Sequence, residues 1–160
     1  MAGFEHHDLQ GETIDLGTGT GRLAIGAAKM GSKRVVGVDI DEKSIALARE
    51  NAISAGVQVD WLISDIKKIR GRYDTVIMNP PYGTRSPHLD VRFLERAFEL
   101  APVSYSIHKS STREYLNRVI AKKNRRVDAL RNMTLNIPHL FPFHHKKWNN
   151  VEVDLYRIVS

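Results

Sequence analysis

The chain has 160 residues, of which 42% are hydrophobic, so it is long enough for one domain with a substantial core. It has 24 Lys and Arg residues against 18 Asp and Glu, and the formal net charge of +6 favours polyanionic partners. The absence of cysteine excludes disulfides, cysteine nucleophiles and cysteine-ligated zinc within the chain. The longest apolar stretches have only the length of a strand and the start lacks a signal-peptide pattern, so we expect an intracellular, cytoplasmic protein.

Hydrophobic patterning predicts strands alternating with helices through about residue 125. The strands are expected at residues 13–16, 34–38, 57–63, 74–78 and 103–107, and the helices at 23–30, 41–55, 91–100 and 112–124. Asp41 and Asp90 are expected to cap their helices, and Gly31 to end the first one. Two more strands, 127–135 and 151–158, follow with no helix between them.

This order predicts an α/β fold with a mostly parallel seven-stranded sheet, helices on both faces and an antiparallel C-terminal hairpin at one edge. In open sheets of this kind, ligands bind beyond the carboxyl ends of the strands. The residues that suit ligand binding follow strands in just this way, at 15–21, Asp39, Asp65, 79–82 and His108.

A glycine-rich turn, Asp15-Leu-Gly-Thr-Gly-Thr-Gly21, connects the first strand to the first helix. Glycines let the backbone turn tightly and approach a ligand closely. Dinucleotide-binding proteins use the spacing G-x-G-x-x-G, but Arg22 occupies the third glycine position here. The spacing G-x-G-x-G with a preceding acidic residue fits S-adenosylmethionine better, and Asp15 is expected to help hold its aminoacyl cation.

Two more carboxylates follow strands. Asp39 can accept hydrogen bonds from both ribose hydroxyls of a nucleoside, although nicotinamide-binding proteins use the same arrangement. Asp65 can accept from the adenine amino group of the cofactor, the alternative being a loop or capping aspartate. The cofactor-binding residues expected from these motifs are Asp15, Gly17, Thr18, Gly19, Gly21, Asp39, Ile40, Asp65, Ile66 and Asn79.

The segment Asn79-Pro80-Pro81-Tyr82 is the expected catalytic site. An exocyclic amine is a poor nucleophile because its lone pair is delocalised into the ring. The Asn79 side-chain carbonyl and the Pro80 backbone carbonyl can accept its two N–H groups, and Tyr82 can stack on a planar substrate. No strong base is needed, because the proton leaves after methyl transfer. The alternative is an ordinary proline turn.

With both motifs in place, the chain resembles the Rossmann-like class I amino methyltransferases. More narrowly, it resembles the archaeal and eukaryotic methyltransferase-like-five family, which methylates adenine N6 in small-subunit ribosomal RNA. The matching stretches are 15–21, 38–41, 74–84, 105–112, 143–147 and 151–155. The Ser-Ile-His-Lys and Phe-His-His-Lys-Lys stretches are the most specific to that family.

The resemblance implies S-adenosylmethionine as methyl donor, adenine N6 in RNA as acceptor and, at least in eukaryotes, a small zinc-binding activator protein as partner. It also implies a single methyltransferase domain over residues 1–160. The family usually carries a Gln-Tyr-x-Thr segment before the first strand that helps to cover the cofactor. Only 12 residues precede Thr13, so we expect a shortened N-terminal segment. Tyr82 stands where many relatives have Phe, and both can stack.

Basic and aromatic residues beyond these motifs suit contacts with RNA, because Lys and Arg bind phosphate and aromatic rings stack on bases. The expected RNA-binding residues are Arg85, His108, Lys109, Arg113, His144, His145, Lys146, Lys147 and Trp148. For the basic helix that starts near Thr112, the alternative is a solvated face. No metal site is expected, because no carboxylate or cysteine cluster accompanies His144 and His145.

Three other functions stay open at this point. A release-factor glutamine-N5 methyltransferase shares Asn-Pro-Pro-Tyr but usually adds a helical N-terminal domain. A DNA adenine methyltransferase typically carries a target-recognition domain. A non-catalytic RNA-binding or scaffold subunit would keep the fold without the chemistry, and the intact segment 79–82 argues against it.

Overall fold

The computed structural model describes residues 7–81, 88–138 and 148–160. Seven strands form its sheet: β1 (Glu12–Leu16), β2 (Arg34–Asp39), β3 (Asp60–Ile63), β4 (Thr75–Met78), β5 (Val103–Lys109), β6 (Arg126–Pro138) and β7 (Trp148–Val159). The α-helices are α1 (Arg22–Lys29), α2 (Glu42–Ala55), α3 (Leu89–Leu100) and α4 (Arg113–Lys122). Short 3-10 turns lie at η1 (His7–Leu9), η2 (Ile66–Lys68) and η3 (Ser110–Thr112).

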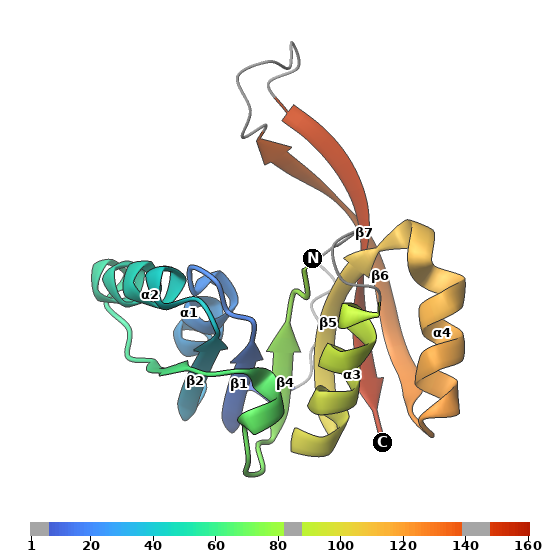
Figure 1. Ribbon diagram of the computed structural model, residues 1–160, viewed down its shortest axis with the longest axis horizontal. Helices are drawn as coiled ribbons and strands as arrows, with labels where there is room; N and C mark the ends of the chain where they lie inside the picture. Colours follow the sequence, from blue (N-terminus) through green and yellow to red (C-terminus); the bar gives the residue numbers. More distant parts are fainter. Residues whose placement is uncertain (1–6, 82–87, 139–147) are drawn as a thin grey trace.

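The sheet has the strand order β3-β2-β1-β4-β5-β7-β6 (Figure 1). Strands β1 to β5 pair in parallel, whereas β7 pairs antiparallel with both β5 and β6. The expected mostly parallel sheet with an antiparallel C-terminal hairpin is therefore confirmed. The strand order reverses between β1 and β4, and in sheets of this type the ligand crevice lies at that reversal.

Helices cover both faces of the sheet, and each face has its own core. Against one face, α3 and α4 contribute Phe93, Leu94, Leu116 and Ile120 to a cluster that also contains Tyr156 of β7. Against the other, α1 places Ala24 and Ala27 on Val35 and Ile77. The alanines let α1 lie close to the strands, which brings the glycine-rich turn before it to the edge of the sheet.

Two helix starts test the capping expectations. Asp41 is the N-cap of α2, and its carboxylate accepts from Lys43 N and Ser44 N at 3.3 and 3.1 Å, as expected. For α3 the expectation is wrong: His88 is the N-cap, with a φ of 65° and no capping side chain, and Asp90 lies inside the first turn. Asp90 instead accepts from the adjacent Val91 N at 2.9 Å.

Three strands depart from their expected bounds by three residues at one end, and the others by at most two. β3 begins only at Asp60, so the alternating residues 57–59 before it stay outside the sheet. β6 and β7 are longer than expected, because their cross-strand pairing continues to Pro138 and Trp148. Residues 134–138 and 148–152 thus form a two-stranded ribbon that continues past the end of β5, which we call the arm (Figure 1).

Among the described residues, no helix combines the length and the apolar character that a membrane span requires.

Candidate cofactor and methyl-acceptor site

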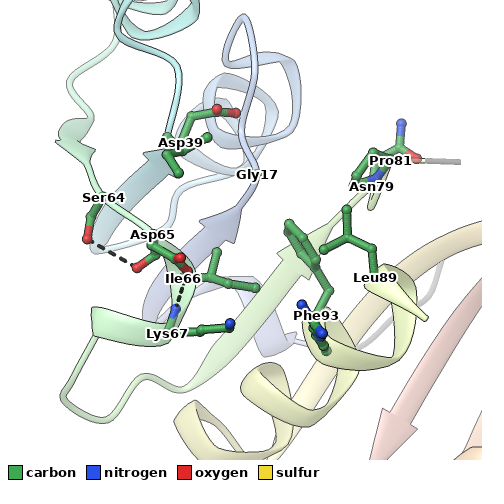
Figure 2. A pocket seen from close by; sticks show the side chains of 12 residues that line it. Gly17, Asp39, Ser64, Asp65, Ile66, Lys67, Asn79, Pro81, Leu89 and Phe93 are labelled. Atoms are coloured by element: carbon green, nitrogen blue, oxygen red, sulfur yellow. Dashed lines mark hydrogen bonds between the residues drawn. The ribbon is translucent and has the colours of Figure 1, made fainter. Parts of the chain in front are cut away.

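A cavity of about 420 Å³ opens at the carboxyl ends of β1 to β4, beside the reversal of strand order (Figure 2). This volume lies in the range of small-molecule sites. Each of the four strands contributes the residues that follow it, and the start of α3 closes the opposite wall. The lining residues are Gly17, Asp39, Ile40, Ser64, Asp65, Ile66, Lys67, Asn79, Pro81, Leu89, Arg92 and Phe93.

Asp39 is fixed at the end of β2 by two backbone N–H groups. Gly19 N donates to one carboxylate oxygen at 2.8 Å, and Asp41 N donates to the other at 3.0 Å. Each oxygen of an ionised carboxylate can accept about two hydrogen bonds, so both oxygens keep a free acceptor site. The glycine turn thereby orients a carboxylate that can receive two hydroxyl groups from the cavity.

Asp65 follows β3, and the capping role weighed for it is confirmed. Its carboxylate caps η2 by accepting from Lys67 N at 2.9 Å, and Asp65 also lines the cavity. Ile66 lines the cavity beside it, and Ile40, which is 72% exposed, lies against the same space after β2. Large apolar side chains exposed at a cavity suit a flat ring placed between them.

The glycine turn is held from beneath by Asp15, which is 1% exposed. One of its carboxylate oxygens, Oδ2, accepts from Thr18 Oγ1 at 2.6 Å and from Ala24 N at 3.0 Å. The other oxygen, Oδ1, has no hydrogen-bond partner in the part of the chain that the structure describes. Burial raises the pKa of Asp15 to about 7. Asp15 is not among the residues that line the cavity, so its visible contacts serve the turn.

Gly17 is the point where the turn meets the cavity. Its φ is +70°, and a Cβ there would lie 2.8 Å from Phe93 Cε1, closer than real Cβ contacts allow. Glycine is therefore required both by the left-handed backbone and by the α3 side chain that packs on it. Of the other expected turn residues, Thr18 holds Asp15, Gly19 donates to Asp39, and Gly21 begins α1.

Asn79 and Pro80 follow the fully buried strand β4 at the same cavity. Asn79 is exposed and lines the wall opposite Asp39, whereas Pro80 is buried and Pro81 again lines the cavity. In Figure 2, Asn79 and Pro81 lie across the cavity from Asp39, Asp65 and Ile66. The two predicted motifs therefore share one cavity, as a reaction between a bound nucleoside and an amine requires.

Two of the expected RNA-binding residues have other partners. His108 is only 3% exposed, which contradicts the expectation that its ring meets RNA. Its Nε2 lies 2.6 Å from Ser106 Oγ, and burial lowers its pKa to about 4, so the ring is neutral at physiological pH. Arg113 is half-exposed, but its guanidinium donates twice to the buried Asp154 at 2.7 Å.

Of the other expected RNA-binding residues, only Lys109 has a described side chain. Lys109 is exposed at the end of β5, the strand next to β4. Trp148 starts β7, and its side chain lies outside the described part. The residues that lie wholly outside the described ranges are Tyr82, Arg85, His144, His145, Lys146 and Lys147.

The wall formed by α3 was missed at the sequence level. Leu89 and Phe93, one helical turn apart, line the cavity together with Arg92. Their spacing is that of any buried helix face, so no motif separates them from core residues. Ser64 and Lys67, which flank the Asp65-Ile66 pair, were also not predicted to line the site.

The residues present fit S-adenosylmethionine. Asp39 offers two acceptor sites for ribose hydroxyls, Ile40 and Ile66 offer apolar contact for an adenine ring, and Asp65 offers an acceptor near it. Fold and cavity together define a Rossmann-like methyltransferase that uses S-adenosylmethionine, and solved structures of the same fold carry this cofactor or its demethylated product.

Comparison with known proteins gives the family. The methyltransferase small domain family matches residues 2–103, and the chain belongs to this family. The rRNA N(6)-adenosine-methyltransferase Mettl5 of Drosophila melanogaster is 34% identical over 162 residues, which cover 96% of this chain and 76% of that protein. The crystal structure of PH1948 from Pyrococcus horikoshii is 35% identical, with a TM-score of 0.83, and the match covers 93% of this chain and 74% of that one.

A shorter match points to a different acceptor. A Methanocaldococcus jannaschii protein described as a protein N5-glutamine methyltransferase, MJ0928, is 39% identical over 72 residues. That match covers 44% of this chain and 36% of the relative. It therefore supports a shared methyltransferase core rather than a shared acceptor.

Proposed function

We propose that the chain transfers a methyl group to the N6 amine of adenine in RNA, with small-subunit ribosomal RNA as the substrate. The observation that carries this proposal is the position of Asn79, which lies on the wall of the nucleoside-type cavity opposite Asp39. Relatives that are named as rRNA N6-adenosine methyltransferases align with 94 to 96% of the chain, which favours RNA over other amine substrates.

The chemistry needs little from the protein besides orientation. Bound S-adenosylmethionine supplies an electrophilic methyl group. The Asn79 side-chain oxygen and the Pro80 carbonyl would accept the two N–H groups of the amine and orient its nitrogen. As the new N–C bond forms, the sulfur–methyl bond would break to leave S-adenosylhomocysteine, and one amine proton would then pass to solvent. Holding two reactants in line can supply roughly 7–11 kcal/mol of the barrier reduction.

The substrate adenine has to leave its helix or be unpaired already. Flipping a paired base out costs a few kcal/mol, and single-stranded loops avoid that cost. The basic net charge of +6 assists binding to any such RNA without selecting a sequence. A small zinc-binding activator protein stays a prediction from the family resemblance and would add selectivity.

The alternative is transfer to a glutamine amide, which is also planar and carries two N–H groups. The short match to a glutamine methyltransferase is the observation in its favour. The test is an incubation of the chain and radiolabelled S-adenosylmethionine with small ribosomal subunits that lack the modification, and separately with a release-factor protein. We expect label in RNA, whereas label in the release factor with unlabelled RNA would replace the proposal by the alternative.

A further inference from the structure

The arm extends beyond the sheet at the edge where methyl transfer takes place. Pairing between β5 and β7 ends at Lys109 and Val153, and, among the described residues, those at 148–152 of β7 pair with β6 alone. Five strand residues span about 17 Å. Because β4 and β5 run parallel, the end of β5 lies at the same edge of the sheet as Asn79. The arm therefore projects from the edge of the sheet at which β4 ends and Asn79 lies (Figure 1).

A two-stranded ribbon is only marginally stable by itself in water, so its direction has to be fixed where it leaves the sheet. Asp154 lies at that point. It follows Val153, the residue of β7 at which pairing with β5 ends, and it is 0% exposed. Its carboxylate accepts from Arg113 Nε and Nη2 at 2.7 Å, from Ser110 Oγ at 2.9 Å and from Asn132 Nδ2 at 3.1 Å.

The four residues of this Asp154 cluster come from four elements: β7, α4, η3 and β6. They therefore connect the base of the arm to the helix and turn that follow β5. Asp154 is buried although Arg113 is half-exposed, and a charge taken out of water gains little net stability from its partner, because the desolvation cost offsets most of the attraction. The better-attested effect of such a pair is to favour one arrangement of the connected elements.

The exposed side of the arm suits RNA. Asn136 and Asn150 are paired across the ribbon and exposed, and such amides contact phosphate, sugar and base edges. The carboxylate of the arm, Glu152, is hydrogen-bonded to Thr134 Oγ1 opposite it. Glu152 keeps its negative charge, so contacts of the arm with RNA would rest on the exposed amides rather than on charge.

We propose that the Asp154 cluster is a joint that directs the arm onto the RNA that flanks the methylated adenine. The inference rests on the proposed function for the nature of the substrate. The joint itself rests only on the buried contacts at the base of the arm. Asp154 and Arg113 are accordingly positioning residues: they act on the substrate through the direction of the arm.

The test variant is Asp154→Asn, because a side chain with no exposure cannot touch RNA itself. The matched control is Asp128→Asn. Asp128 lies in β6 away from the arm, and its carboxylate pairs with Arg157 and Arg126. Two acceptors are compared: a small-subunit RNA fragment, and an adenosine trinucleotide too short to reach the arm. For Asp154→Asn we expect KM for the fragment to rise about tenfold, with the trinucleotide rate within about twofold of wild type.

Hydrogen exchange measures the joint independently of activity. In Asp154→Asn the backbone amides of residues 134–136 and 150–152 should exchange faster, while those of β1 and β4 keep their rates. Arg113→Lys, which keeps the charge but loses the two-pronged contact, should show the same changes in weaker form and serves as the milder variant if Asp154→Asn is too unstable.

Three results would contradict the proposed joint. They are unchanged amide exchange in the arm of Asp154→Asn, an equal loss of activity on the RNA fragment and the trinucleotide, and a rise in KM in Arg113→Ala that Asp154→Asn does not show. The last result would make Arg113 a direct RNA contact instead. If the wild-type chain methylates neither RNA, the proposed function fails, while the exchange experiment still decides whether the joint exists.

Discussion

Asp15 is a buried residue that supports the glycine turn, and its effect on the free energy of unfolding depends on pH. It accepts from Thr18 and Ala24 through one oxygen, while Oδ1 has no partner among the described residues. Burial raises its pKa to about 7, above the ordinary value of 3.8. The folded state therefore holds a proton between about pH 4 and 7 that the unfolded chain releases.

The stability of the wild-type chain should accordingly contain a component that is fully present below about pH 4 and is lost as the pH rises to about 7. Asp15→Asn removes this component, because an amide does not titrate. We expect the difference in free energy of unfolding between variant and wild type to shift in favour of the variant across this pH range. Urea unfolding at several pH values measures it, and a constant difference would contradict the raised pKa.

Asp39 carries the second prediction at this scale. Asp39 lines the cavity, and among the described residues each of its oxygens accepts one hydrogen bond, so Asp39→Asn should weaken cofactor binding. Hydrogen bonds to charged groups contribute roughly 1.5–3 kcal/mol, which corresponds to a Kd about tenfold higher or more. Calorimetric titration with S-adenosylmethionine measures this change. The control is Asp60→Asn, a carboxylate paired with Arg34 outside the cavity, which should leave Kd unchanged.

The residues of the site were predictable wherever a motif follows a strand directly. Asp39, Ile40, Asp65 and Asn79 line the cavity as the sequence predicted, because strand ends of a parallel sheet meet at one edge. The α3 wall was not predictable, since it depends on how a helix packs across the site. His108 was misjudged for a related reason: it was expected at a strand end beside the site, but alternation in β5 turns its side chain inward.

At the scale of elements, α2 depends on its cap. Asp41 accepts from two backbone N–H groups and from Ser44 Oγ, and the hydrogen bond from Ser44 contributes most to lowering the pKa of Asp41. Asp41→Ala should lower Tm by about 2–4 °C without changing the affinity for S-adenosylmethionine. Thermal melting and titration check both halves, with Glu42→Ala as the neighbouring control. A large loss of cofactor affinity would instead make Asp41 a ligand.

The helices and strands were predicted best where apolar periodicity is strong. α1, α2 and β2 lie within one residue of their expected bounds, because each buries a continuous apolar face. The arm was underestimated because its outer residues, such as the exposed Asn136 and Asn150, are held by cross-strand pairing rather than by burial. Hydrophobic patterning does not register that kind of contact, so the joint at Asp154 became visible only in three dimensions.

On the scale of the whole molecule, charge should govern how RNA binds. A protein that neutralises several phosphates of a single strand loses affinity steeply with salt, and about three contacts already give a tenfold loss between 50 and 200 mM. With a net charge of +6, the chain should show at least this dependence for a small-subunit RNA fragment. Filter binding across a salt series measures it, and an affinity independent of salt would argue against a phosphate-binding surface.

The topology itself followed from the order of the elements, since strands that alternate with helices build a parallel sheet and two final strands without a helix pair antiparallel. The acceptor does not follow from topology. The role proposed for Asn79 would narrow the acceptor to a planar amine or amide, and the proposed step to ribosomal adenine rests on the relatives and on the family resemblance.

The most direct test is therefore nucleoside mass spectrometry of small-subunit RNA after incubation with the chain and labelled S-adenosylmethionine. We predict labelled N6-methyladenosine with the wild-type chain and none with Asn79→Ala, whose cofactor affinity should still be measurable by titration. Unlabelled RNA, label on another base, or an unchanged yield with Asn79→Ala would contradict the assignment of this site to adenine N6.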